Sequence, residues 1–489
     1  MTRDETTVLS VDVGSSSVRA ALHGADGSPI VGTDTKLDYE FEHDAEGAAV
    51  TDADALFDLV VRAIDGTLSG NAASDAEISA VAMSTFWHSL IGLDRDGRPT
   101  TPVITWADRR AADDARRLRE SLDEGAVHRR TGAVLHSSYW PAKLAWVSRA
   151  RPEVFERSER WVSPGDYFYA RLFGAHAEGT SMASATGLFD QNERVWDEEV
   201  VEALPVEAAQ LSPISDEPRR EFGGEWAERW PALRGVPWFP AAGDGACSNI
   251  GSGCTTNERL ALMVGSSGAM RVLWKAASVR IPDGPWCYRS DPGRFVMGGA
   301  LSNGGNLVAW LRDTLRLPGE GEAEEALARM TPDSHGLTFL PLLAGERGPG
   351  WADIANGTIA GLSMSSTPIE ILRAAMESVA YRFALIAEML EVASPGDKVV
   401  VATGGGLLGS PTWTQIMADT LDRPVTVSGV EEASSRGAAL LALEGLGELQ
   451  IEAAPAPLGE TFEPDPDRHE VYREALARQQ RLYEAVLGG

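Results

Sequence analysis

The sequence predicts an α/β protein built from two related lobes, and two observations support this prediction. The segment VLSVDVGSSSVRAAL at residues 8–22 is similar to the segment LALMVGSSGAMRVLW at residues 260–274. Each is an apolar strand that runs into a Gly-Ser turn, with an arginine just beyond it, Arg19 or Arg271. The chain also has 489 residues, which is long for a single hydrophobic core, so two domains are expected.

The two Gly-Ser turns indicate phosphate binding. A strand that ends in glycine and small hydroxyl residues presents backbone N–H groups at close range, as binding of a phosphate requires. Arg19 adds positive charge beside the first turn. Two lobes that each place such a turn against a shared cleft point to an ATP-using enzyme. The residues expected to supply donors in the first turn are Ser15, Ser16 and Ser17.

Net charge and apolar patterning restrict the partners. The net charge of -29 argues against nucleic acids and anionic membranes, since both would be repelled. Anionic ATP must then be held by local donors and a divalent cation. No stretch approaches the roughly 18 consecutive apolar residues of a membrane span, and the N-terminus lacks the apolar core of a secretory signal. We therefore expect a cytoplasmic protein with reduced, buried cysteines at Cys247, Cys254 and Cys287.

The remaining elements of the first lobe follow in order. Residues 53–68 have helical periodicity, and the apolar strand ISAVAM comes after them. Residues 107–128 are charged and predicted to be helical. The tract 139–240 is richer in Trp, Pro and acidic residues, which favours an irregular insertion that determines substrate specificity.

The pattern restarts near residue 255 with strand, Gly-Ser turn, strand and helices. A long helix with an apolar face is predicted over residues 368–393, followed by the strand KVVVATGGG. Residues 451–465 are rich in proline and acidic residues and are predicted to be a linker, and residues 466–486 a surface helix. We therefore expect three parts: 1–253 with the sugar site and catalytic base, 254–447 with the nucleotide site, and 448–489 as an acidic linker and C-terminal helix.

Two aspartates occupy places where phosphoryl transfer needs carboxylates. Asp12 ends the first strand, two residues before the turn, and is well placed to hold Mg²⁺ through water, because Mg²⁺ gives up its waters reluctantly. Asp244 lies between glycines at the start of a short helical run, where its ionised form is favoured and it can accept a hydroxyl proton. A plain turn at either position is the alternative.

Aromatic and glycine-rich segments indicate the two substrates. His88 in TFWHSLIGL and the segment Trp106–Arg110 in ITWADRRA predict a sugar site, with an aromatic wall and hydrogen-bonding partners. A structural histidine and solvated arginines are the alternative. Gly404–Gly406 follows an apolar strand and would let a flat ring such as adenosine approach the backbone, although a generic strand-to-helix turn has the same pattern. P-loop NTPase and protein-kinase motifs are absent from the sequence.

These segments together resemble the FGGY carbohydrate kinase family, within the actin-like, sugar kinase and chaperone ATPase superfamily. The resemblance spans about residues 8–445, and the string GGGLLGSPTWTQIMADTLDRPV is similar to the family's C-terminal motif. The other matching strings are VDVGSSSVRA, the His88 region, TWADRRA, GDGACSNIG, VGSSGAMR and GGNLVAWLRD.

The resemblance implies two ribonuclease-H-like domains with ATP and Mg²⁺ in the cleft between them. It implies that Asp244 is the catalytic base and that Asp12 is the carboxylate that supports Mg²⁺. The residues expected at the sugar are Trp87, His88, Trp106, Asp108 and Asp244, of which His88 matches the family's sugar-contacting motif. The residues expected at the nucleotide are Ser15, Ser16, Ser17, Arg19, Gly265, Ser266, Gly305, Gly405, Gly406 and Ser410. All of them except Ser16, Gly265 and Gly406 match positions of the family's nucleotide site.

Within the family, the sequence is most similar to gluconate kinases. Xylulose kinases usually carry glycine where Ser89 follows the histidine, whereas gluconate kinases commonly carry methionine where Trp87 stands. The expected reaction is ATP-dependent phosphorylation of D-gluconate to 6-phospho-D-gluconate. The alternatives are a xylulose, ribulose or other polyol kinase, and a non-catalytic sugar sensor or chaperone-like ATPase. The expected partners are a sugar or sugar acid and ATP, with a homodimer as the candidate assembly.

Overall fold

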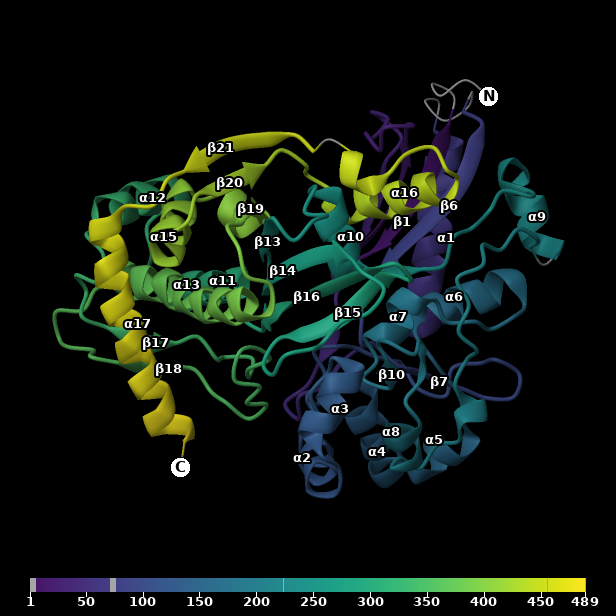
Figure 1. Cartoon of the computed structure of the whole chain (residues 1–489), viewed down its shortest axis with the longest axis horizontal. Helices are drawn as coiled ribbons and strands as arrows, with labels where there is room; N and C mark the ends of the chain where they lie inside the picture. The colour runs from purple at the N-terminus through teal and green to yellow at the C-terminus, as the bar shows by residue number, and fades with distance from the viewer. Residues whose placement is uncertain (1–5, 71–75, 223, 455, 489) are drawn as a thin grey trace. The chain divides into compact units, whose positions relative to one another are not determined.

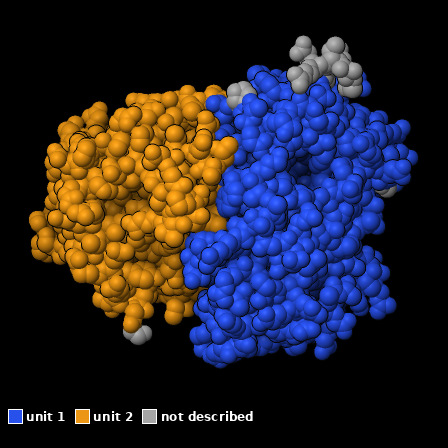
Figure 2. Space-filling model, viewed as in Figure 1, with its two compact units in different colours: residues 1–255, 273–296, 431–456 blue, residues 256–272, 297–430, 457–489 orange. Residues whose placement is uncertain are grey.

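The structure, a computed structural model, describes residues 6–70, 76–222, 224–454 and 456–488. The chain divides into two compact units, each assembled from separate segments (Figure 2). Unit 1 contains Met1–Thr255, Leu273–Val296 and Glu431–Ala456, and unit 2 contains Thr256–Val272, Met297–Val430 and Pro457–Gly489. The division predicted from the sequence, with boundaries after residues 253 and 447, stays a prediction.

Unit 1 is built on a five-stranded sheet with the strand order β12-β6-β1-β2-β3. Figure 1 labels β1 and β6 of this sheet. Strands β1 and β2 are antiparallel, as the first predicted turn requires, whereas β1, β6 and β12 are parallel. Their carboxyl ends therefore meet at one edge of the sheet. The strands are β1 (Thr7–Val13), β2 (Ser17–His23), β3 (Thr35–Asp38), β6 (Ile78–Thr85) and β12 (Ala242–Gly243).

The register of these parallel strands brings distant residues into one row. Asp12 is paired with Ser84, and Ser84 is paired with Ala242. Helix α10 (Asp244–Gly251) begins directly after β12, so Asp244 lies near the end of the same row. The sheet therefore delivers both predicted carboxylates to one place.

Two helices pack on this part of unit 1 with almost no space between them. α10 contacts α16 (Ala433–Gly445), which also contacts β1 and β6. A Cβ on Gly251 would lie 1.8 Å from the carbonyl oxygen of Ala433, and a Cβ on Gly437 would lie 1.8 Å from that of Cys247. The backbones therefore touch at both glycines, which fixes α10 and its first residue, Asp244.

The rest of unit 1 is richer in helices than the sequence suggested. The helix predicted over residues 53–68 is α1 (Ala53–Ser69). The helix predicted over residues 107–128 is divided into two, because the backbone of Leu122 is extended and Asp123 caps a new helix. The tract 139–240, expected to be irregular, contains helices α4 to α9. The helices of this part of unit 1, after α1, are α2 (Ala112–Ser121), α3 (Glu124–Thr131), α4 (Trp140–Ala150), α5 (Pro152–Arg157), α6 (Pro164–Phe173), α7 (Thr180–Ser184), α8 (Glu198–Glu202) and α9 (Gly224–Arg229).

Short strands complete this part of the chain. β4 pairs with β5 and β5 with β8, while β7 pairs with β9 and β10 with β11. These strands are β4 (Glu42–His43), β5 (Ala49–Thr51), β7 (Ile91–Leu93), β8 (Val103–Ile104), β9 (Arg160–Val162), β10 (Phe189–Asp190) and β11 (Val195–Trp196).

A second sheet has seven strands in the order β15-β16-β14-β13-β19-β20-β21. Its strands β14-β13-β19-β20 repeat the directions of β2-β1-β6-β12, with one antiparallel pair followed by two parallel pairs. The internal similarity seen in the sequence is therefore a repeat of topology. The strands are β13 (Arg259–Val264), β14 (Gly268–Lys275), β15 (Trp286–Asp291), β16 (Arg294–Leu301), β19 (Val399–Thr403), β20 (Val425–Ser428) and β21 (Leu458–Phe462).

The helices of unit 2 include the long helix predicted from periodicity. α13 (Pro368–Ala393) has the predicted bounds, and Thr367 and Glu370 form a capping box at its start. The tract predicted as a linker, 451–465, contains the edge strand β21. The other elements are α11 (Gly305–Thr314), α12 (Glu320–Arg329), β17 (Thr338–Leu340), β18 (Thr358–Ala360), α14 (Gly405–Leu408), α15 (Pro411–Leu421) and α17 (Pro466–Leu487).

The C-terminal helix α17 is more than a surface element. It contacts α13, α15 and β17, and it buries Tyr472, Ala475 and Gln479. The three cysteines are buried and form no disulfide among the described residues, as predicted. Within the described residues, the search for a helix long and apolar enough to cross a bilayer finds none.

Candidate active site

The carboxylates of Asp12 and Asp244 lie close enough to interact. Asp12 Oδ1 is buried and has no hydrogen-bond partner within the described part of the chain. Burial raises the pKa of Asp12 to about 7, and the negative charge of Asp244 acts in the same direction. A buried, unpartnered carboxylate oxygen beside a second carboxylate fits a divalent cation, which would supply the missing positive charge.

Asp244 is held at the start of α10, as the sequence predicted. Its Oδ1 accepts a hydrogen bond from the N–H of Gly245 at 2.7 Å, and its carbonyl accepts one from the hydroxyl of Ser434 at 3.4 Å. A helix N-terminus favours the ionised form of a carboxylate. Asp244 is therefore suited to accepting a proton.

The first Gly-Ser turn joins β1 to β2 beside Asp12. The N–H of Gly14 donates to the carbonyl of Ser17 at 2.9 Å, which closes the turn. Tyr39 braces it, because its hydroxyl donates to Gly14 O at 2.6 Å and its N–H donates to Ser16 O at 3.0 Å. Ser15 and Ser16 are exposed, and Ser17 is half-buried. The sequence analysis missed Tyr39, since nothing local marks it as a neighbour of the turn.

Arg19 follows the turn on β2, and its guanidinium is paired with acidic side chains. Nη2 lies 2.7 Å from Oε1 of Glu432, and Nη1 lies 3.6 Å from Oδ2 of Asp34. Burial raises the pKa of Glu432. A phosphate that approaches Arg19 therefore competes with a carboxylate for the same guanidinium.

A group of aromatic side chains lies in unit 1 around the predicted sugar-binding residues. The ring centroid of His88 is 5.0 Å from that of Tyr139 and 5.4 Å from that of Tyr288. Trp87 packs edge-on against Tyr288 at 5.3 Å, and Trp286 stacks on Tyr288 at 4.5 Å with an interplanar angle of 7°. The hydroxyls of Tyr139 and Tyr288 are hydrogen-bonded to each other. Sequence reasoning found Trp87 and His88 but missed the other three.

The backbone and ring of His88 are both held in place. Its φ of 66° is unusual for a residue other than glycine. The carbonyl of His88 accepts a hydrogen bond at 2.7 Å from Lys143 Nζ, which also donates to Ser138 O at 2.7 Å. His88 Nδ1 lies 2.6 Å from the carbonyl of Ala185. A carbonyl only accepts, so Nδ1 carries a proton and donates it to this carbonyl.

Asp108 supports its own loop. Its carboxylate accepts hydrogen bonds from the Arg110 guanidinium, with Nε 3.0 Å from Oδ1, and from the N–H of Ala49 at 3.2 Å. Arg110 also lies over the ring of Trp146, 4.3 Å from its centroid. Trp106, which precedes Asp108 in the same loop, is half-buried. Direct contact of Trp106 or Asp108 with a sugar stays a prediction.

Three glycine-containing turns of unit 2 pack together through their backbones. The N–H of Gly305, at the start of α11, donates to Gly265 O at 2.7 Å. A Cβ on Gly305 would lie 2.6 Å from that oxygen. Gly404 has a φ of 84°, and a Cβ there would lie 2.5 Å from Val264 O. The second Gly-Ser turn, with Ser266 in it, is thus held between the turns that contain Gly305 and Gly404.

Beside these turns unit 2 contains a cavity of about 420 Å³. This volume lies within the range of small-molecule sites. Its apolar wall is formed by Leu327, Leu372, Met376 and Trp413, and polar groups come from Arg312, Glu320, Glu324 and Ser410. Of the predicted nucleotide-binding residues, the cavity lining includes Gly305, Gly405, Gly406 and Ser410.

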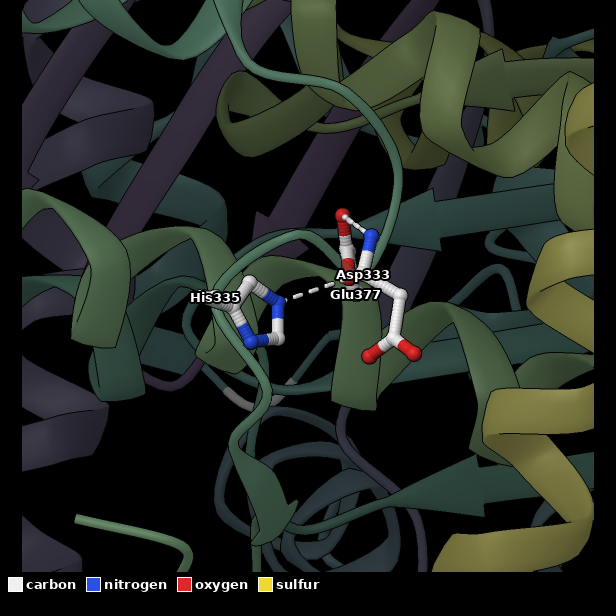
Figure 3. A group of neighbouring side chains, drawn as sticks. All are labelled: Asp333, His335 and Glu377. Atoms are coloured by element: carbon white, nitrogen blue, oxygen red, sulfur yellow. Dashed lines mark hydrogen bonds and ion pairs between the residues drawn. The ribbon is translucent and has the colours of Figure 1, made fainter.

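Unit 2 also contains a group of carboxylate and imidazole side chains that resembles a metal centre: Asp333, His335 and Glu377 (Figure 3). His335 Nε2 lies 3.0 Å from Oε2 of Glu377. Arg373 Nε lies 2.6 Å from Oε1 of Glu377, and Arg478 Nη1 lies 3.0 Å from Oδ2 of Asp333. Burial raises the pKa of Glu377, but His335 and Arg373 outweigh it and hold the pKa below its usual value. Protein cations therefore neutralise this group, which joins α13 to α17.

Comparison with known families decides the identity of the fold. The N-terminal domain of the FGGY family of carbohydrate kinases matches residues 7–251, and the C-terminal domain matches residues 260–445. The chain belongs to the FGGY family of carbohydrate kinases. The predicted fold class, with two ribonuclease-H-like domains of the actin-like ATPase superfamily, is therefore confirmed. FGGY kinases use ATP, generally with a divalent metal, to phosphorylate a sugar substrate.

Individual FGGY proteins are similar to this chain at low identity. A gluconokinase from Bacillus subtilis (strain 168) is 28% identical over 478 residues, 94% of this chain and 91% of the relative. A glycerol kinase from Citrifermentans bemidjiense is 29% identical over 488 residues, 96% of each. A gluconate kinase structure and a ligand-bound xylulose kinase structure, both from Lactobacillus acidophilus, each have a TM-score of 0.89 and 26% identity, and 98% of each chain is covered.

Proposed function

We propose that this FGGY kinase transfers the γ-phosphoryl group of ATP to the terminal hydroxyl of D-gluconate, which gives 6-phospho-D-gluconate. The observation that carries the proposal is that the carboxylates of Asp12 and Asp244 lie close together at one edge of the unit 1 sheet. A carboxylate at a helix N-terminus and a second, buried carboxylate supply the two functions that phosphoryl transfer needs. The motif similarity to gluconate kinases and the gluconokinase relatives support gluconate as the acceptor.

In this proposal each residue of unit 1 has a distinct task. Asp244 accepts the proton of the attacking hydroxyl late in the transfer. The ring of His88, oriented by the hydrogen bond between Nδ1 and the carbonyl of Ala185, contributes to the wall that contacts the sugar. The N–H groups and hydroxyls of Ser15 and Ser16 donate to phosphate oxygens. Asp12 would hold Mg²⁺, which neutralises charge on the transferred phosphates when it is bound.

The nucleotide belongs, in the same proposal, to the cavity of unit 2. The apolar wall around Trp413 and Met376 suits a base, and the bare backbone at Gly405 admits it closely. Gly305 lines this cavity, and its N–H donates to the carbonyl of Gly265. The turn that contains Gly265 therefore lies beside the cavity. The cavity therefore offers a nucleoside site next to a phosphate turn.

A neutral ketose or polyol is the second candidate acceptor, and two observations favour it. Trp87 stands where gluconate kinases commonly carry methionine, and a larger ring changes the pocket wall. Arg110, one candidate partner for a substrate carboxylate, is already engaged by Asp108. The similarity to a xylulose kinase structure equals the similarity to a gluconate kinase structure.

An ADP-release assay with Mg²⁺-ATP tests the proposal against this candidate. The acceptors are gluconate, xylulose, ribulose and glycerol, each compared with a reaction that lacks an acceptor. We expect the highest kcat/KM for gluconate. A higher kcat/KM for a neutral acceptor would replace gluconate while leaving the roles of Asp12 and Asp244 intact, and turnover of none of these acceptors would contradict both candidates.

A further inference from the structure

A carboxylate lines the cavity of unit 2, where an anionic nucleotide is expected. Glu324 of α12 is half-buried and is held at the N-terminus of α15. Its Oε2 accepts a hydrogen bond from the hydroxyl of Ser410 at 2.7 Å, and its Oε1 accepts one from the N–H of Thr412 at 2.8 Å. Ser410 Oγ in turn accepts from the N–H of Trp413 at 3.1 Å. The position of the carboxylate is therefore fixed before any ligand binds.

The negative charge of the Glu324 carboxylate restricts which part of a nucleotide this side chain can face. A carboxylate repels phosphates, so Glu324 must face an uncharged portion that donates hydrogen bonds. A nucleotide has two such portions, the 6-amino group of adenine and the ribose hydroxyls. The apolar side chains that share the cavity, among them Leu327, Leu372 and Trp413, suit the faces of the base, and the ribose offers two adjacent hydroxyl donors to the two oxygens of Glu324. A carboxylate oxygen has two lone-pair sites, so each oxygen of Glu324 retains capacity beside its bond to Ser410 or Thr412.

We infer that Glu324 accepts hydrogen bonds from the ribose hydroxyls of the nucleotide and makes this kinase select ribonucleotides over 2′-deoxyribonucleotides. The inference rests on the proposed assignment of the unit 2 cavity to the nucleotide. Each hydrogen bond to a charged group contributes enough to change affinity by about 10-fold or more when it is lost. The 2′-hydroxyl is the only group that distinguishes ADP from 2′-deoxy-ADP, so the ratio of their affinities reports this contact.

Calorimetric titration of the full-length protein with ADP and with 2′-deoxy-ADP, in buffer with MgCl₂ and without sugar, measures that ratio. We expect the wild type to bind ADP about 10-fold more tightly than 2′-deoxy-ADP. Glu324→Gln and Glu324→Ala should weaken ADP binding and bring the ratio close to one. Glu322→Gln is the matched control, because Glu322 is exposed on the same helix, and it should retain the wild-type ratio.

A second variant separates recognition from support of the α15 N-terminus. Ser410→Ala removes the hydroxyl that donates to Glu324 and caps α15. This variant should bind both ADP and 2′-deoxy-ADP more weakly, while the ratio of their affinities stays well above one. A wild-type ratio near one, or an unchanged ratio in both Glu324 variants, would overturn the inference. Absence of ADP binding would overturn it together with the cavity assignment. The titration contains no sugar, so failure of gluconate as the acceptor leaves its outcome unaffected.

Discussion

The indole ring of Trp87 packs directly against Gly243, the residue that precedes Asp244. A Cβ at position 243 would lie 1.8 Å from Cε2 and 1.9 Å from Nε1 of this ring. Ser181 joins the two, because its carbonyl accepts from Trp87 Nε1 at 3.0 Å and its hydroxyl accepts from Gly243 N at 3.1 Å. The wall of the aromatic pocket and the proposed catalytic base are therefore parts of one packed unit.

Gly243→Ala should lower both stability and kcat/KM, because the new methyl group displaces Trp87 or Asp244. An overpacked core contact costs about 1–3 kcal/mol. Trp87→Met removes most of the ring, so the double variant Trp87→Met/Gly243→Ala should recover stability relative to Gly243→Ala alone. Urea unfolding and acceptor kinetics of the four proteins form a double-mutant cycle. Additive effects of the two substitutions would contradict the contact.

Asp244→Asn should abolish most turnover while the fold and nucleotide binding are retained. The amide keeps the shape of the side chain but accepts no proton, and general-base assistance contributes about 10²–10⁴-fold. Steady-state kinetics should show the loss in kcat, and calorimetry should show an unchanged affinity for ADP. Turnover within a few-fold of the wild type would remove Asp244 from the role of base.

Gly404→Ala and Gly405→Ala should separate the folding and binding roles of the third glycine turn. Gly404 has a positive φ and touches Val264, so alanine there should lower the melting temperature. Gly405 lines the cavity, and its Cβ would meet nothing within 4 Å. Gly405→Ala should leave the melting temperature unchanged and weaken ADP binding by about 10-fold, since overpacking costs about 1–3 kcal/mol. The reverse pattern would contradict the assignment of the cavity.

His23 should make the protein sensitive to mild acid. Burial lowers the pKa of His23 to about 4, and the ring lies between Gly27 O at 3.2 Å and Ser435 Oγ at 3.4 Å. Among nearby charges, Arg436 lowers this pKa further and Asp26 raises it. The unfolded chain binds a proton near pH 6.5 and the folded chain does not. The contribution of His23 to stability is therefore fully present above about pH 6.5 and is lost progressively as the pH falls from about 6.5 to about 4.

Urea unfolding at about pH 7.5 and about pH 5 measures this loss. The contribution of His23 to the difference should be about 2 kcal/mol, and His23→Gln should remove it. The exposed His43 provides the control, because His43→Gln should leave the pH dependence as in the wild type. An equal acid loss in the wild type and His23→Gln would exclude His23 as its source.

The features that the sequence predicted are those with strong local signals. The two Gly-Ser turns, the helix over 368–393 and the position of Asp244 at a helix start each depend on residues that are neighbours in the chain. Local signals failed at residue 122, where an extended backbone divides a charged helical pattern in two.

The aromatic pocket shows why part of the site lay beyond sequence reasoning. Tyr139 is about 50 positions from His88 and Tyr288 about 200, and neither stands in a motif that sequence analysis isolated. Only the packing of separate segments brings their rings within 5.4 Å of His88. In the same way, Glu324 acquires its significance from Ser410 and Thr412, which follow it by more than 80 residues in the chain.

The segmental composition of the two units has a consequence for synthesis of the chain. Unit 1 requires Glu431–Ala456, which includes the helix that packs on α10, and unit 2 requires Pro457–Gly489, which includes α17. Within each unit these segments follow all the others in the chain, so they are synthesised after the rest of that unit. A nascent chain that ends before them leaves apolar sheet and helix surfaces uncovered in both units at once. Each unit can therefore complete its fold only after its last segment has been synthesised, and until then its uncovered apolar surface is open to aggregation.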